Sequence, residues 1–296
     1  MEGPMMVLAG PGSGKTAVIT GRTCRLVEQG VPAGAILVVT FTKAAAREMK
    51  ERYLKRMNRP STQVTFGTFH GVFYGILRNA YRLSGENILS EEQKQRLLKE
   101  LVHTYCRDTE DEEELIANLN REIGTVKNNR IQLEHFYSTA CPEEIFRTIY
   151  RTYEEWKQKN RKLDFDDIMV WCYELFQKHP EILSLWQKKF QYILIDEFQD
   201  INPIQYDIVR MLAKPQDNLF IVGDDDQSIY RFRGARPEIM LHFPNDYPNA
   251  KTVTLDINYR SSGAIVRRAG KLIAHNEKRF PKNITASHGQ GAAVAL

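Results

Sequence analysis

The sequence lacks the features of a membrane, secreted or fibrous protein. No apolar run approaches the length of about eighteen residues that a membrane-spanning helix needs, and the mean hydropathy is −0.44. No secretory signal precedes the first apolar run, Met5–Leu8. Of the 296 residues, 42% are hydrophobic and 26% are charged, which excludes collagen, a coiled-coil rod and a wholly disordered chain. We therefore expect a globular protein with no membrane partner.

Cysteine is scarce, and its four residues are scattered: Cys24, Cys106, Cys141 and Cys172. No two of them form a C-x-x-C pair, which argues against a zinc site and against a disulfide framework. Free, dispersed cysteines suit a reducing compartment, so we expect a cytoplasmic location.

The net charge is only +4, but the basic residues are unevenly distributed. Residues 21–60 hold nine Lys and Arg against three acids, and residues 260–282 hold seven against one. Such stretches are compatible with a polyanionic partner, or they are simply solvated faces. Charge alone leaves both interpretations open.

Strand and helix signals alternate at both ends of the chain and not in its middle. Strands are expected at Met5–Leu8, Ile36–Thr40, Gln63–Phe66, Tyr192–Ile195, Leu219–Val222 and Thr252–Leu255. Helices are expected from about Lys15, over Ala44–Arg56 and over Gly263–Asn276. From Phe73 to Lys189 the pattern is helical throughout, with helices such as Glu91–Tyr105, Pro142–Lys159 and Phe165–Lys178. This order predicts an α/β fold with a parallel sheet, interrupted by an all-helical insertion.

A glycine-rich loop separates the first strand from the first helix. Its residues are Ala9-Gly10-Pro11-Gly12-Ser13-Gly14-Lys15-Thr16, the Walker A pattern of P-loop NTPases. The glycines let backbone N–H groups converge on phosphates at a helix N-terminus. Lys15 would reach the β- and γ-phosphates, and the Thr16 hydroxyl would bind Mg²⁺. A merely glycine-rich turn is the competing interpretation, and the strand–loop–helix context argues against it.

Two acids end the apolar strand Tyr192–Ile195. Carboxyl ends of parallel strands share one edge of the sheet, so Asp196 and Glu197 are expected beside the glycine-rich loop. Asp196 could hold Mg²⁺, and Glu197 could orient and deprotonate an attacking water. An Asp-Glu pair alone would more often begin a solvated loop. Combined with the Walker A pattern, it predicts ATP hydrolysis.

A third strand end carries Gly223-Asp224-Asp225-Asp226-Gln227. Gln227 is a candidate sensor of the γ-phosphate. The alternation of aromatic residues and Arg that follows, including Tyr230 and Phe232, suits stacking on nucleic acid bases. The same alternation also suits a strand whose aromatic residues lie in the core.

Several motifs together resemble the UvrD/Rep/PcrA-type superfamily 1 helicases. Besides the Walker A run they are T-F-T-K-A-A-A-R-E-M at 40–49, T-F-H-G at 68–71, L-D-F-D-D at 163–167, I-D-E-F-Q-D at 195–200, V-G-D-D-D-Q-S-I-Y-R-F-R-G-A at 222–235 and N-Y-R-S at 258–261. The resemblance extends from residue 5 to about residue 282.

This resemblance implies roles that spacing alone does not give. Arg260 would be an arginine finger on the γ-phosphate, and Tyr259 would stack on adenine. The single-stranded DNA track would be lined by Phe41, Thr68, His70, Tyr230 and Phe232. Without the resemblance, Arg260 would be a surface arginine and His70 a packed or capping histidine. The family implies ATP-driven 3′→5′ movement on single-stranded DNA and at duplex–single-strand junctions, usually in repair or replication.

The resemblance also predicts domains. Residues 1–72 and 190–280 would form a RecA-like ATPase lobe, and residues 73–189 its helical insertion. Residues 281–296 would begin a second RecA-like lobe, with a strand starting near Gly291, so we expect the chain to be an N-terminal fragment that does not unwind DNA alone. Two positions depart from the family: Ala17 replaces a usual arginine, and Phe232 a commoner tryptophan.

Two other functions remain as alternatives. One is a DNA-binding scaffold or nuclease-complex subunit with a vestigial ATPase, which the intact site residues Lys15, Thr16, Asp196, Glu197, Gln227 and Arg260 argue against. The other is a small-molecule P-loop kinase. Such a kinase needs a pocket for the phosphate acceptor, and the sequence shows no sign of one. RNA in place of DNA is not excluded by the residues.

Overall fold

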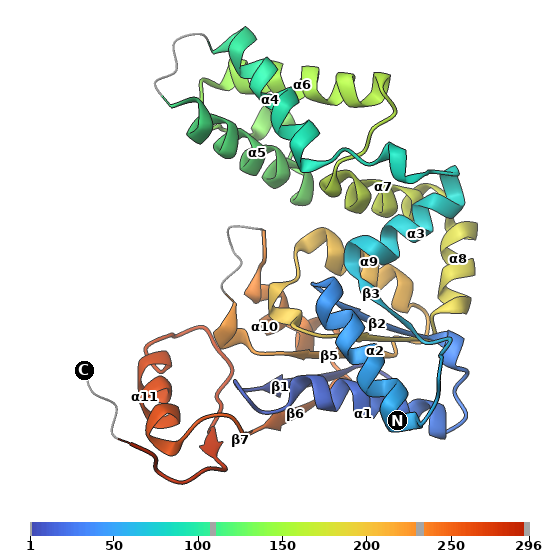
Figure 1. Cartoon of the computed structure of the whole chain (residues 1–296), viewed down its shortest axis with the longest axis vertical. Coiled ribbons are helices and arrows are strands. Elements are labelled where there is room, and N and C mark those ends of the chain that lie inside the picture. Colours follow the sequence, from blue (N-terminus) through green and yellow to red (C-terminus); the bar gives the residue numbers. More distant parts are fainter. Residues whose placement is uncertain (1, 107–110, 229–233, 293–296) are drawn as a thin grey trace. The chain divides into compact units, whose positions relative to one another are not determined.

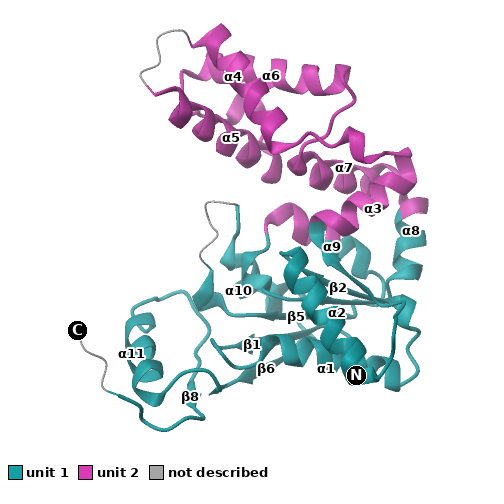
Figure 2. Ribbon diagram, viewed as in Figure 1, with its two compact units in different colours: residues 1–69, 183–201, 209–296 teal, residues 70–182, 202–208 magenta. Residues whose placement is uncertain are grey.

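The computed structural model describes residues 2–106, 111–228 and 234–292. Within these ranges the chain forms two compact units (Figure 2). Unit 1 consists of residues 1–69, 183–201 and 209–296, and unit 2 of residues 70–182 and 202–208. Among the described residues, no helix combines the length and the apolar character needed to cross a membrane.

Unit 1 is built on a six-stranded sheet in the order β3-β2-β4-β5-β1-β6 (Figure 1). All neighbouring strands pair in parallel. The strands are β1 (Met5–Ala9), β2 (Ile36–Thr40), β3 (Thr65–Thr68), β4 (Tyr192–Ile195), β5 (Leu219–Gly223) and β6 (Lys251–Leu255). Two further short strands, β7 (Ile257–Asn258) and β8 (Thr285–Ala286), pair with each other.

Burial follows from the position of each strand in the sheet. The inner strands β2 and β5 are buried at every residue, as expected for strands covered on both faces. The edge strand β6 is largely exposed. The core of unit 1 packs the apolar residues of the inner strands against helix residues such as Ile19, Met49 and Tyr53. Since all strands run the same way, the loops that follow them gather at one edge of the sheet.

The helices that belong wholly to unit 1 connect these strands. They are α1 (Lys15–Glu28), α2 (Lys43–Met57), α10 (Pro237–Asp246) and α11 (Gly263–Ile273), with the short helices η1 (Ala33–Ala35), η4 (Phe198–Asp200) and η5 (Asp225–Gln227). Three more helices contain residues of both units: α3 (Phe69–Tyr81), α8 (Pro180–Lys189) and α9 (Pro203–Ala213).

Unit 2 is helical. Its helices are α4 (Glu91–Tyr105), α5 (Glu112–Asn128), α6 (Glu143–Lys159) and α7 (Phe165–Lys178), with η2 (Gly85–Asn87) and η3 (Leu133–His135). Its core contains buried leucine, isoleucine and aromatic side chains of α4, α5 and α6, including Leu98, Leu119, Phe146 and Tyr153.

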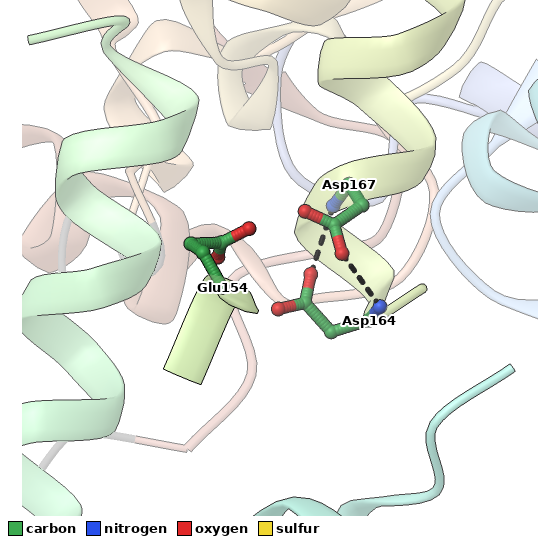
Figure 3. A group of neighbouring side chains, drawn as sticks. All are labelled: Glu154, Asp164 and Asp167. Atoms are coloured by element: carbon green, nitrogen blue, oxygen red, sulfur yellow. Dashed lines mark hydrogen bonds between the residues drawn. The ribbon is translucent and has the colours of Figure 1, made fainter. Parts of the chain in front are cut away.

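A buried ionic cluster joins three helices of unit 2. Asp164 caps α7, and its side chain and that of Asp167 each accept a hydrogen bond from the other's backbone N–H, at 2.8 and 2.9 Å (Figure 3). The ammonium groups of Lys127 and Lys157 lie within 2.5 to 3.1 Å of oxygens of both aspartates and of Glu154. Burial raises the pKa of Asp164, but the two ammonium groups outweigh it and hold this pKa well below its usual range. The motif at 163–167 therefore supplies both the helix cap and two of the buried carboxylates of this cluster.

The α/β fold with a parallel sheet and a helical stretch is confirmed, and one strand position was wrong. β3 covers Thr65–Thr68 and not Gln63–Phe66, because its register is set by pairing with β2, where Thr40 lies opposite Thr68. The final helix ends at Ile273, three residues before the expected Asn276. The strand expected from Gly291 falls mostly outside the described residues, and the exact domain boundaries stay a prediction.

Candidate nucleotide site at the carboxyl edge of the sheet

The glycine-rich loop turns sharply between β1 and α1. Gly12 and Gly14 have φ angles of 68° and 89°, in the left-handed region where a side chain would be strained. The Ser13 hydroxyl donates to the Gly10 carbonyl at 2.6 Å, which closes the turn. Lys15 and Thr16 are the first two residues of α1, so the loop opens onto a helix N-terminus that favours anions.

Residues 258–260 and Ile284 lie close to this loop. The Tyr259 backbone N–H donates to the Gly12 carbonyl at 3.0 Å, and the Asn258 side-chain amide donates to the Pro11 carbonyl at 2.6 Å. A Cβ atom at Gly12 would lie 2.7 Å from the Cβ of Arg260, and one at Gly10 would lie 2.6 Å from Ile284 Cδ1. Close approach therefore favours glycine at both positions, and Gly12 also needs it for its backbone conformation.

Lys15 and Glu197 meet at the carboxyl edge of the sheet. Lys15 Nζ donates to Glu197 Oε2 at 2.6 Å, although 182 residues separate them in the sequence. Glu197 follows β4 and adopts a φ of 51°, which is uncommon for a residue with a side chain. Gln199 Nε2 donates to the same Glu197 oxygen at 2.8 Å. A strained backbone and two donors thus fix this carboxylate against the phosphate loop.

Asp196 differs from its neighbour because it is buried and incompletely paired. Its side chain is almost inaccessible to solvent, and among the described residues its Oδ1 has no hydrogen-bond partner. Burial, with the charge of Glu197 adding and that of Lys15 opposing, raises the pKa of Asp196 to about 6. A buried carboxylate oxygen without a partner next to a phosphate loop fits a divalent cation such as Mg²⁺. Thr16 is the other residue expected to hold it.

Asp200 is a further acid near this site, and its position in the sequence does not identify it as a site residue. Its Oδ1 also lacks a partner within the described chain, and burial together with the charge of Glu197 raises its pKa to about 6. Asp200 ends η4, one turn after Glu197. In the sequence, Asp200 is visible only as the third acid of the run at 195–200. Its distance from Asp196 and Glu197 along the chain does not indicate a role.

The end of β5 connects to the same group of side chains. Asp224 is fully buried, and its backbone N–H donates to Gln199 Oε1 at 3.0 Å. Gln227 Nε2 donates to Asp224 Oδ2 at 2.6 Å. Through Gln199, the candidate γ-phosphate sensor Gln227 is therefore linked by hydrogen bonds to Glu197.

Two basic residues after α11 bind the acids that follow β5. Lys282 Nζ lies 2.6 Å from Asp224 Oδ1, 2.5 Å from Asp225 Oδ1 and 2.8 Å from Asp226 Oδ2. Arg279 donates two hydrogen bonds to the two oxygens of Asp226, at 2.8 and 2.7 Å. Two of the seven basic charges in residues 260–282 are therefore neutralised internally and do not form part of an exposed basic surface.

Arg260 and Tyr259 follow β7, next to Gly12. Both are exposed, and the Arg260 backbone N–H donates to Asn258 Oδ1 at 2.9 Å. The structure thus brings the phosphate loop, Lys15, Glu197 and the start of the Arg260 side chain to one edge of the sheet. The roles of Arg260 as an arginine finger and of Tyr259 as an adenine contact stay predictions.

The candidate DNA-track residues are divided among different parts of the chain. Thr68 ends β3 opposite Thr40, and Phe41 follows Thr40 directly, so both belong to the carboxyl edge of the sheet. Phe41 packs on Phe69, with ring centroids 5.2 Å apart. His70 belongs to unit 2, where its ring and that of Phe165 form a T-shaped pair with centroids 5.6 Å apart. Tyr230 and Phe232 lie outside the described residues.

Comparisons with known proteins bear on the whole chain. A family model described as the UvrD/REP helicase N-terminal domain matches residues 1–248. YjcD of Bacillus subtilis is 42% identical over 294 residues, covering 97% of this chain and 38% of that protein. The ATP-dependent DNA helicases PcrA of Staphylococcus epidermidis and Staphylococcus aureus are 37% identical over 303 residues, covering 99% of this chain and 41% of each relative. The chain spans about two fifths of the length of these curated relatives.

Proposed function

This chain belongs to the UvrD/REP helicase family, and on that basis we propose that it binds and hydrolyses ATP with Mg²⁺ to drive movement on single-stranded DNA. One contact carries the proposal: Lys15 Nζ lies 2.6 Å from Glu197 Oε2, so the phosphate-binding lysine and the candidate base occupy one site. The unpartnered oxygen of the buried Asp196 supports a cation beside them.

Each residue of the site has its own role in the proposed hydrolysis of ATP. Backbone N–H groups of the glycine-rich loop, other than Pro11, which has none, and the N-terminus of α1 bind the phosphates. Lys15 exchanges its contact with Glu197 for the β- and γ-phosphates, which frees Glu197 to orient water and accept its proton. Asp196 and Thr16 would hold Mg²⁺, which neutralises phosphate charge when bound. Gln227 and Arg260 stabilise charge on the γ-phosphate in the transition state, and Tyr259 stacks on adenine.

The test of the ATPase is turnover by the full-length protein in the presence of single-stranded DNA. Glu197→Gln removes the base and keeps an amide of the same shape. We expect turnover to fall by about 10²-fold or more, with nucleotide binding retained. Turnover at the wild-type rate in Glu197→Gln would contradict the proposal and favour a DNA-binding scaffold with a vestigial ATPase.

The DNA track is the second part of the proposal. Phe41 follows the last residue of β2 and Thr68 ends the neighbouring strand β3, both at the carboxyl edge of the sheet, and His70 comes two residues after Thr68. We propose that these residues, with Tyr230 and Phe232, contact single-stranded DNA and that movement runs 3′→5′. Aromatic rings stack on bases without regard to sequence, which suits a motor that passes over any strand.

Binding of a fluorescent oligonucleotide by the full-length protein tests this track. Phe41→Ala should weaken binding by about 1–3 kcal/mol, the range for one stacked base. Tyr137→Ala removes an aromatic ring that is 71% exposed in unit 2 and should leave affinity unchanged. Affinity should also fall as salt concentration rises, because bound phosphates release counterions. Equal affinity of Phe41→Ala and wild type would assign Phe41 to packing on Phe69.

The rest of the proposal concerns the whole protein. Its relatives are more than twice as long as the matched region, and we propose that unwinding of duplex–single-strand junctions requires a second RecA-like lobe. We further propose a cytoplasmic role in DNA repair or replication. The 296-residue chain should bind nucleotide weakly and leave duplex DNA intact, which a strand-displacement assay would measure.

A further inference from the structure

The three consecutive aspartates after β5 form a buried acidic group that needs a positive charge. Ligand oxygens of Asp224, Asp225 and Asp226 lie within 4.8 Å of one another, close enough to hold a metal ion. The ammonium group of Lys282 lies among them, 2.5 to 2.8 Å from one oxygen of each. The side chains of Lys282 and Asp224 are 1% and 0% exposed. A lysine therefore supplies the charge that a cation would otherwise supply.

Asp224 is shared between Lys282 and the nucleotide site. Its Oδ1 accepts from Lys282 and its Oδ2 accepts from Gln227 Nε2, both at 2.6 Å. Its backbone N–H donates to Gln199, whose amide group donates to Glu197. A continuous chain of hydrogen bonds thus extends from Lys282 through Asp224 to Gln227 and Glu197.

The segment around Lys282 contacts the site at two neighbouring strands. Phe280 donates its backbone N–H to Asp225 Oδ2 at 2.8 Å, at the end of β5. Ile284 lies against Gly10, at the end of β1, where an added Cβ would approach it to 2.6 Å. Because β5 and β1 are adjacent in the sheet, residues 279–284 cross the carboxyl edge beside the phosphate loop.

We propose that Lys282 is a positioning residue for ATP hydrolysis: it fixes Asp224, and Asp224 in turn orients Gln227 and, through Gln199, Glu197. This inference rests on the proposed function, because it assigns Gln227 and Glu197 their roles in the reaction. The ammonium group of Lys282 is held by the three aspartates, so the proposal gives it no contact with the phosphates. Without it, Asp224 and Asp225 lose their ammonium partner while Asp226 keeps Arg279, and Asp224 loses the contact that holds its orientation.

The experiment measures kcat and KM for ATP in the full-length protein at saturating single-stranded DNA. Lys282→Met should lower kcat about 10- to 100-fold, the effect of a small misplacement of reacting groups, with KM nearly unchanged. Lys282→Arg keeps the charge and should recover most of the lost kcat. Lys278→Met removes an exposed lysine of the same segment and should match wild type.

A double variant tests the route of the effect. In a Gln227→Ala background, Lys282→Met should lower kcat much less than it does alone, since both changes disable the same group. A wild-type kcat in folded Lys282→Met protein, or equal losses in both backgrounds, would overturn the proposal. If thermal melting shows that Lys282→Met does not fold, Lys282→Gln with Asp225→Asn removes one carboxylate together with the ammonium group. In that variant a lowered kcat supports the proposal and a wild-type kcat overturns it.

Lys15→Ala separates this inference from the proposed function. Loss of turnover in Lys15→Ala together with full turnover in Lys282→Met would overturn only the role of Lys282. Full turnover in Lys15→Ala would overturn the ATPase site itself, and the inference with it.

Discussion

At the residue scale, the two acids after β4 are adjacent in sequence and differ in their surroundings. Glu197 is partly exposed and pairs with Lys15, whereas Asp196 is buried with an oxygen that has no partner in the described chain. Burial disfavours the charged form of Asp196, and Mg²⁺ would compensate for it. The two roles proposed for this pair, cation ligand and base, therefore follow from differences in burial and pairing.

Gly12 provides a sharp test of the phosphate loop. At Gly12, an alanine would have a positive φ, and its Cβ would lie 2.7 Å from the Cβ of Arg260. At Gly30, an alanine would have a φ of 92°, but no atom lies within 4 Å of its Cβ. Gly30→Ala should cost about 1 kcal/mol of stability from backbone strain alone. Gly12→Ala should cost more and should also weaken nucleotide binding. Urea unfolding and nucleotide titration measure the two effects, and equal behaviour of both variants would contradict the close approach of Arg260.

His70 predicts a dependence of stability on pH. Burial lowers the pKa of His70 below 6.5, and the nearby Asp166 only partly opposes this shift. The unfolded chain therefore binds the proton more readily than the folded one does. The stability that neutral His70 contributes to the free energy of unfolding is fully present above pH 6.5. It is lost as the pH falls through the folded-state pKa.

The measurement is urea unfolding at pH 7.5 and pH 5.5, two values chosen to lie on either side of about 6.5. His70→Gln should reduce the loss of stability between these values, because glutamine does not titrate. His103→Gln, at a side chain that is 62% exposed, serves as the control and should leave the loss as in wild type. An identical loss in wild type and His70→Gln would show that His70 keeps its ordinary pKa.

At the scale of elements, the sheet was largely predictable and its exceptions have physical causes. Apolar runs such as Ile36–Thr40 and Leu219–Val222 identify strands that are buried on both faces, where sequence and structure must agree. β3 is an edge strand containing Gly67, so its own composition does not fix its position. Pairing of Gly67 with Val39 in β2 decides the register.

The site residues that follow strands could be predicted from the sequence. The site residues that come from distant segments could not. Lys15, Asp196 and Gln227 follow apolar runs, so their shared edge can be inferred from the parallel sheet. Lys282 cannot be found in this way. It follows a helix in a basic stretch and meets Asp224 only through the tertiary fold, 58 residues away in sequence.

The ionic cluster of unit 2 predicts which helix contacts are sensitive to substitution. Lys127 is 4% exposed and contacts Asp164 and Asp167, each at 2.7 Å. Lys127→Met should destabilise unit 2 by about 3–5 kcal/mol, because it leaves carboxylates buried without their partner. Arg47→Met breaks an exposed pair with Glu51 on α2 and should change stability little. Chemical unfolding of the two variants tests this, and similar small effects would show that the cluster is solvated.

At the scale of the whole molecule, the chain combines a sheet unit with a helical unit formed by residues inserted between β3 and β4 and by the start of α9. Separate apolar cores stabilise the two units. The order of the motifs along the chain, and not any single one, predicted the family that the comparisons then showed. The charge distribution contributed less, since Arg279 and Lys282 are used internally.

We propose that the carboxyl edge of the sheet binds Mg²⁺ and ATP through Lys15. The most direct measurement is calorimetric titration of a non-hydrolysable ATP analogue into the 296-residue chain, with and without Mg²⁺. We expect weak but saturable binding at one site, which requires Mg²⁺, is lost in Lys15→Ala and persists in Lys278→Met. Absence of saturable binding by the wild-type chain, or equal binding by Lys15→Ala, would contradict the claim.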